Sequence, residues 1–124
     1  MTEPKIVQDA YKSFIDDLVS NAKEMGSGSR LASQGNLILE SKDDEKAFKK
    51  LFSQLSPSQR DLLIRVLQEE RHGAFHDLLA ALTWQIDCNG FALTFQGEPM
   101  QYYEGGLHCD FVGRASGDWE WPQE

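Results

Sequence analysis

The chain has 124 residues, 40% of them hydrophobic, and carries 20 acidic against 12 basic side chains, a formal net charge of −8. This length holds one domain, 1–124, and excludes an α/β barrel or a two-domain enzyme. The excess of carboxylates argues against nucleic acid and membranes as partners, because both are bound through lysine and arginine. There is no signal-peptide pattern and no apolar stretch long enough to span a bilayer, so a cytoplasmic protein is expected.

The first third of the chain predicts one helix and then a loop. Apolar side chains recur at intervals of three and four over residues 5–25, the period of an amphipathic helix. The Gly-Ser repeat at 26–29 ends this helix, and a loop is predicted from there to about Ser41. The apolar run at 37–39 fits a strand, a helical turn or a loop that plugs the core, and the sequence does not decide between them.

Two helix starts follow, each with a recognisable cap. Ser41 is the expected N-cap of a helix that reaches Leu55, and the carboxylates in its first turn favour the helix dipole. Ser56, Pro57 and Gln59 form the pattern of a capping box with proline at the first helical position. A long helical pattern therefore begins there and continues to about residue 87.

The apolar stripe of this long segment changes direction in the middle. Projected at about 100° per residue, the stripes before His72 and after Gly73 point roughly 120° apart. A continuous helix would present its two halves to two different partners. A kink or break at Gly73, which costs about 1 kcal/mol relative to alanine in a helix, is the preferred prediction. Asn89 and Gly90 are expected to end the segment with a left-handed cap or a tight turn.

The last segment, 88–124, differs in composition from the helical body at about 5–87. It carries six acidic side chains and one basic one, a net charge of −5, and seven of the 13 aromatic residues. Apolar side chains alternate over 91–95 and again over 107–111, so two paired strands are predicted. The expected fold is mainly α, with three or four packed helices closed by a C-terminal β-hairpin or an irregular aromatic cap.

The two cysteines do not form a recognisable motif. Cys88 and Cys109 are too few for a disulfide scaffold and form no CxxC pair, so reduced thiols are the simplest expectation. A bridge between them is the alternative if the C-terminal segments pair. Pairing of either thiol with a histidine is open as well, because such partners meet in space and not in sequence. No catalytic residue or cofactor is assigned.

Three of the four candidate metal ligands share one side of the long segment. On a continuous helix, Glu69, His72 and His76 fall within an arc of roughly 60°, and His108 would complete a tetrahedral set for Zn²⁺ if the C-terminal hairpin folds over them. The competing interpretation is a solvated helix face, because these residues lie off both apolar stripes. A di-iron site is disfavoured, because only one Glu-x-x-His pair is present.

The acidic aromatic end is the stronger indication of function. Tyrosine and tryptophan are favoured anchors at protein interfaces, and surrounding carboxylates select a basic partner. The predicted partner-binding residues are Tyr102, Tyr103, Asp118, Trp119, Glu120 and Trp121. The structural alternative is that Trp119 and Trp121 fold back over the helices as a lid and leave the carboxylates in solvent.

These observations favour a non-enzymatic protein–protein interaction module that binds a basic partner protein. Size and charge resemble those of small acidic bacterial proteins that neutralise basic toxins, a similarity of profile without a shared motif. A metal-dependent hydrolase or other metal-binding protein that uses Glu69, His72, His76 and His108 is the first alternative. A helical homodimer without a ligand is the second, because the long helical segment has room for an intermolecular partner.

Overall fold

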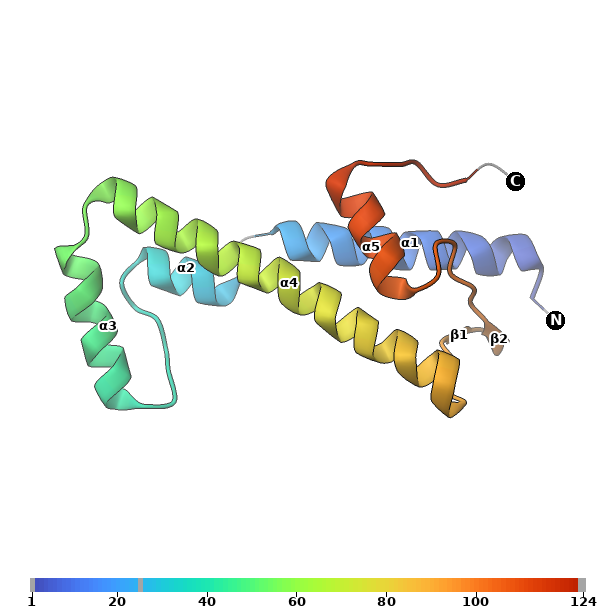
Figure 1. Ribbon diagram of the computed structural model, residues 1–124, viewed down its shortest axis with the longest axis horizontal. Helices are drawn as coiled ribbons and strands as arrows, with labels where there is room; N and C mark the ends of the chain where they lie inside the picture. Colours follow the sequence, from blue (N-terminus) through green and yellow to red (C-terminus); the bar gives the residue numbers. More distant parts are fainter. Residues whose placement is uncertain (1, 25, 123–124) are drawn as a thin grey trace. The chain divides into compact units, whose positions relative to one another are not determined.

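A computed structural model describes residues 2–24 and 26–122 (Figure 1). These residues form the helices α1 (Pro4–Lys23), α2 (Ser27–Ser33), α3 (Lys42–Gln54), α4 (Pro57–Asn89) and α5 (Leu107–Ser116), and the strands β1 (Thr94–Phe95) and β2 (Glu98–Pro99). The structure is 69% helical, and β1 and β2 pair antiparallel near the C-terminus, so the prediction of a mainly α fold with a small β part is confirmed. Within the described ranges, every helix is too short or too polar to cross a membrane.

The chain divides into two compact units. Unit 1 comprises Met1–Asn21 and Ala74–Glu124, and unit 2 comprises Ala22–Gly73. The C-terminal segment therefore groups with most of α1 and with the second half of α4. The expected single domain, 1–124, with a helical body at about 5–87 and a cap at about 88–124, stays a prediction.

Helix α4 is continuous through Gly73, so the predicted break is absent. A Cβ at Gly73 would clash with no described atom, and a single glycine costs a helix only about 1 kcal/mol, less than the hydrogen bonds lost in a break. The first half of α4 belongs to unit 2 and the second half to unit 1. The alternative prediction, a continuous helix whose halves meet different partners, is therefore confirmed.

The predicted helix caps are present. Ser41 Oγ accepts a hydrogen bond from the Asp44 amide at 3.2 Å. Ser56 Oγ accepts from the Gln59 amide at 3.2 Å, and Gln59 Oε1 accepts from the Ser56 amide at 2.9 Å, which completes the capping box. Gly90 has φ 74°, the left-handed conformation expected after α4.

Unit 2 corrects the prediction of a loop over 26–41. Residues 27–33 form helix α2, in which Ala32 is fully buried. The Arg-Leu-Ala run at 30–32 contains strong helix formers, and its local preference outweighs that of the glycines and serines around it. The apolar run at 37–39 is a loop, held by a 2.8 Å hydrogen bond from the Leu39 amide to Glu45 Oε1.

The second predicted strand is wrong, because residues 107–116 form helix α5. The sequence alternates over this stretch, but the side chains that become buried are Leu107, Asp110 and Phe111, which follow helical spacing. The hairpin is instead formed by β1 and β2, with Gln96 (φ 50°) and Gly97 (φ 82°) between them. Two consecutive positive φ angles are typical of the type I′ turn that connects short antiparallel strands.

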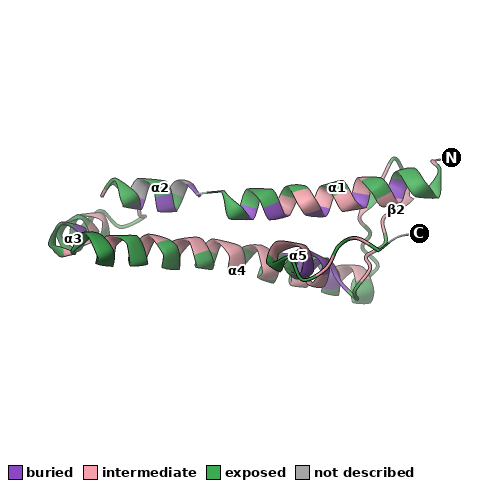
Figure 2. Cartoon of the chain, turned by 90° about the horizontal axis from the view of Figure 1, so that it is seen from above, coloured by how far each residue is buried: buried purple, intermediate pink, exposed green. Residues whose placement is uncertain are grey.

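Helix α5 packs between α1 and α4 in the core of unit 1. The buried face of α1 repeats every four residues and appears as purple patches along the helix in Figure 2. The rings of Phe75 on α4 and Phe111 on α5 stack at 6.0 Å. Thr83 Oγ1 on α4 accepts a 3.0 Å hydrogen bond from the Leu107 amide, one of the free donors at the start of α5. The buried α1 side chains of unit 1 are Val7, Tyr11, Ile15 and Val19.

Candidate functional site

A buried carboxylate joins α5 to α1 and to the loop before α5. Asp110 is fully buried, and its carboxylate accepts a hydrogen bond from the Tyr11 hydroxyl. The amides of Tyr103 and Glu104 also donate to it, each at 2.9 Å. Burial raises the pKa of Tyr11 far above its usual value, and the hydrogen bond to Asp110 raises it further. These donors satisfy the buried carboxylate, so the hydrogen bonds fix the loop before α5 against α5 and α1.

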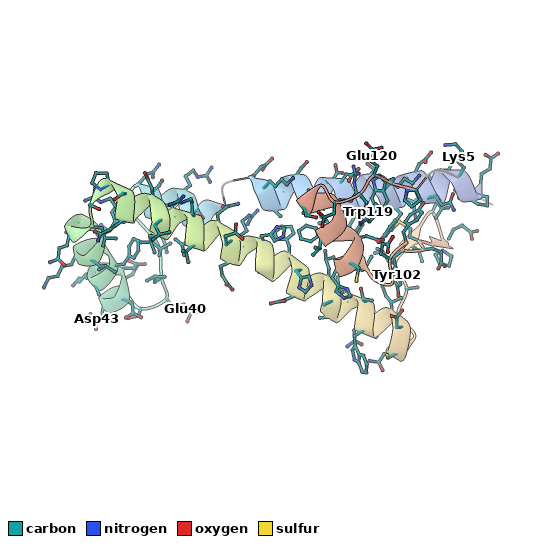
Figure 3. All side chains as sticks on the ribbon, turned by 45° about the horizontal axis from the view of Figure 1, so that its top comes forward. Lys5, Glu40, Asp43, Tyr102, Trp119 and Glu120 are labelled. Atoms are coloured by element: carbon teal, nitrogen blue, oxygen red, sulfur yellow. The ribbon has the colours of Figure 1, made fainter. Side chains whose placement is uncertain are left out.

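The chain after α5 folds back onto α1 and α5. Trp121 Nε1 donates a 3.0 Å hydrogen bond to Asp16 Oδ2 on α1, and its ring lies 6.0 Å from that of Tyr11. Arg114 forms an ion pair with Asp16 at 2.8 Å and lies over the Trp121 ring at 5.2 Å. Trp119 lies beside α5 (Figure 3), so close to Gly113 that a Cβ there would be 1.7 Å from the indole nitrogen. The two indoles therefore form the lid that the structural alternative described.

The predicted partner-binding residues separate into two groups. Tyr103, Trp119 and Trp121 are half-buried, with the Tyr103 and Trp121 rings 5.3 Å apart. Tyr102 is half-buried too, and its hydroxyl donates to Asp87, a hydrogen bond that raises its pKa to about 12. The carboxylates of Asp118 and Glu120 are exposed. The aromatic side chains thus pack within unit 1, whereas the two carboxylates are exposed.

An open pocket of about 400 Å³ lies along α5. Glu104 precedes α5 and Asp118 follows it, so the pocket has a carboxylate from each end of the helix. Its lining residues are His76, Glu104, His108, Cys109, Val112, Gly113, Asp118 and Trp119. All of them belong to unit 1.

Two imidazoles and a thiol meet in this pocket. The rings of His76 and His108 are 5.4 Å apart in an edge-to-face arrangement, and His76 Nδ1 lies 3.1 Å from Asp77 Oδ1. His108 Nε2 lies 3.6 Å from Cys109 Sγ, and its Nδ1 is buried without a hydrogen-bond partner among the described residues. Cys109 and the exposed Cys88 are both free thiols, so the alternative of a disulfide between them is not realised.

The structure brings together only part of the predicted metal set. Glu69, His72 and His76 lie on the continuous helix α4, and the ring of His108 lies 5.4 Å from that of His76. Over residues 2–24 and 26–122, no three histidine, cysteine, aspartate or glutamate side chains are placed to hold one metal ion.

The net charge of the protein resides in unit 1. Unit 1 has twelve acidic and three basic residues, a formal net charge of −9, whereas unit 2 has eight acidic and nine basic residues, a net charge of +1. Dividing the chain into these two units separates the charges more sharply than dividing it at residue 88, where the composition changes. Sequence reasoning missed this because the acidic residues of α1 and those of the C-terminal segment are grouped in one unit only by the fold.

Apolar side chains are exposed on each unit. In unit 1, Leu78 and Leu82 lie one turn apart on α4 and are 62% and 43% exposed, and Trp84 is 59% exposed. In unit 2, Leu62 and Val66 on α4 are exposed as well. These are the residues that the homodimer hypothesis would use, and self-association stays a prediction.

Sequence reasoning also missed the buried role of Asp110 and the pocket along α5. Both depend on α5 being a helix, because a strand would direct neighbouring side chains to opposite faces. The available signal was the Gly105-Gly106 pair before Leu107. Gly106 is the N-cap of α5, and a Cβ there would lie 2.6 Å from the His108 ring.

Comparison with known proteins gives a family and no activity. No curated protein and no solved structure matches the chain. Residues 5–123 match a family described as a family of unknown function, DUF6547. Because the match covers almost the whole sequence, the chain belongs to the DUF6547 family.

Proposed function

We propose that the protein is an interaction module that binds a basic partner protein through the exposed carboxylates of unit 1. The observation that carries this proposal is the segregation of charge, −9 on unit 1 against +1 on unit 2. A concentrated field of one sign accelerates encounter with a partner of the opposite sign and disfavours partners of the same sign.

The few cations of unit 1 leave most of this charge uncompensated. Lys5 pairs with Asp9 at 2.9 Å, and Arg114 pairs with Asp16. Lys12 lies 5.8 Å from the centre of the Tyr103 ring. By contrast, Glu104, Asp118 and Glu120 are exposed and make no ion pair among the described residues. We refer to these three carboxylates as the acidic face.

The packing of the C-terminal segment supports binding by a preformed surface. Trp119 and Trp121 are held against α5 and α1, so the backbone that carries Asp118 and Glu120 is in place before a partner arrives. Preorganisation lowers the conformational entropy lost on binding. The proposal therefore differs from the sequence-based one in that the carboxylates, and not the indoles, make the first contact.

The test reverses the charge of the acidic face and compares this variant with a matched control variant. The first variant carries Glu104→Lys, Asp118→Lys and Glu120→Lys. The control carries three such reversals at exposed carboxylates of unit 2, Asp61→Lys, Glu69→Lys and Glu70→Lys, and changes the net charge equally. The full chain is immobilised, proteins are captured from a native lysate, and thermal unfolding followed by circular dichroism confirms that each variant is folded.

We expect wild type and the control variant to capture from the lysate a protein of high isoelectric point that is released by salt. The variant reversed at the acidic face should lose it. Equal capture by that variant, or equal loss by the control, overturns the proposal, because recognition would then not use the acidic face.

A further inference from the structure

We infer that the pocket along α5 receives an arginine side chain of the basic partner, placed between Asp118 and Trp119. This inference rests on the proposed function and names the group that would be recognised. Charge complementarity supports it, because the pocket lies in the unit with a net charge of −9 and has a carboxylate at each end.

Three features favour a cation at the C-terminal end of α5. Asp118 contributes an exposed carboxylate, and Trp119 contributes an aromatic ring to the same pocket. The helix ends at Ser116 with a left-handed Gly117 (φ 74°), so its carbonyl groups face this end and carry partial negative charge. A guanidinium can stack on an indole and pair with a carboxylate at once, which an ammonium does less well.

The resident arginine does not occupy this position. Arg114 is paired with Asp16 on α1 and lies over Trp121, and it does not line the pocket. Trp119 is fixed against Gly113 and is in place before binding. The pocket volume of about 400 Å³ lies within the range of small-molecule sites and holds a long side chain.

The opposite end of the pocket offers a second carboxylate. Glu104 lies just before α5, beside His76 and His108 in the pocket lining. A helix of 10 residues is roughly 15 Å long at 1.5 Å per residue. An extended segment advances about 3.3 Å per residue, so a second basic residue about four or five positions along would reach Glu104. The favoured segment therefore carries two arginines separated by three or four residues.

The experiment uses a short capped peptide with two arginines separated by three alanines, and the same peptide with one arginine. Binding to the full chain is measured by calorimetry at low salt. Resonances of the Trp119 and Trp84 indoles are followed by NMR. Trp84 serves as an internal control, because it is exposed on α4 and does not line the pocket.

Asp118→Asn and Glu120→Gln form the matched pair of variants. Both residues are exposed and both changes remove one negative charge, but only Asp118 lines the pocket. We expect Asp118→Asn to weaken binding by about tenfold or more, the loss of a charge-assisted pair. Glu120→Gln should weaken it by about twofold at most. Glu104→Gln should weaken the two-arginine peptide and leave the one-arginine peptide unchanged.

Equal effects of Asp118→Asn and Glu120→Gln, or shifts at Trp84 in place of Trp119, overturn the inference. So does equally tight binding of the lysine version of the peptide, which would indicate general electrostatic attraction. Each of these results leaves the proposed function standing if the acidic face still captures a basic protein. Capture that survives reversal of the acidic face overturns the proposed function itself, so the two failures are distinguishable.

Discussion

Gly113→Ala tests the packing of the C-terminal lid most sharply. Gly113 is buried in the middle of α5, and a Cβ at this position would lie 1.7 Å from the Trp119 indole nitrogen. No adjustment of a few tenths of an ångström removes such a clash, so the substitution must displace the indole. Because the lid holds Asp118 in place, the same change should disturb the acidic face.

The expected change in the free energy of unfolding combines two losses and one gain. Displacing a half-buried indole exposes about 100 Å² of apolar surface, which destabilises the fold by about 2.5 kcal/mol. The edge-to-face contact between Trp119 and Trp121, at 5.1 Å, is worth about 0.5–1 kcal/mol more. Alanine in a helix is better than glycine by about 1 kcal/mol, which offsets part of the loss. We expect Gly113→Ala to lower the free energy of unfolding by about 2 kcal/mol.

The assay is urea unfolding followed by tryptophan fluorescence, because all three tryptophans lie in unit 1. Gly73→Ala is the matched control. Gly73 is also inside a helix, but beyond its own helix backbone no described atom lies within 4 Å of its Cβ position, so this change should stabilise by up to about 1 kcal/mol. A Gly113→Ala variant as stable as wild type would refute the packing of Trp119 against α5.

Three further predictions concern the buried carboxylate, alkaline stability and metal. Asp110→Asn should lower the free energy of unfolding, measured by urea unfolding, by about 3 kcal/mol, because an amide cannot accept all the hydrogen bonds of the buried carboxylate. A loss below about 1 kcal/mol would contradict this. The fold raises the pKa of Tyr11 above its value of about 10 in the unfolded chain. The Tyr11 side chain therefore contributes fully to stability below about pH 10. Above that pH the unfolded chain ionises first, and the free energy of unfolding falls by about 1.4 kcal/mol per pH unit. Wild type should therefore lose stability steeply above that pH, and Tyr11→Phe should flatten the slope; equal slopes would refute the linkage. Because no three potential ligands are grouped in the described part of the chain, a chelator should leave the thermal midpoint unchanged, and a fall of several degrees would point back to His76 and His108.

Local sequence signals predicted the elements that depend on local chemistry. The capping box at Ser56 and the N-cap at Ser41 form as expected, because each needs only residues three positions apart. The amphipathic period of α1 likewise predicted a helix with one buried face. The continuity of α4 was harder to predict, because the low helix propensity of Gly73 competes with hydrogen bonds along the whole helix.

Tertiary context decided what sequence patterns could not. Residues 107–111 read as a strand, but Asp110 becomes buried because Tyr11, far away in the sequence, donates to its carboxylate. The roles of Trp119 and Trp121 also depend on distant partners, Gly113 on α5 and Asp16 on α1. Composition identified the acidic aromatic end as the region of interest, and the fold assigned different roles to its rings and its carboxylates.

The measurement that tests the central claim most directly is the affinity of one captured basic protein at increasing salt concentration. It is made for wild type, for the variant reversed at the acidic face and for the control reversed in unit 2. We predict tight, strongly salt-dependent binding by wild type and control, and no measurable binding by the variant reversed at Glu104, Asp118 and Glu120. Equal affinities and equal salt dependence for all three proteins would contradict it.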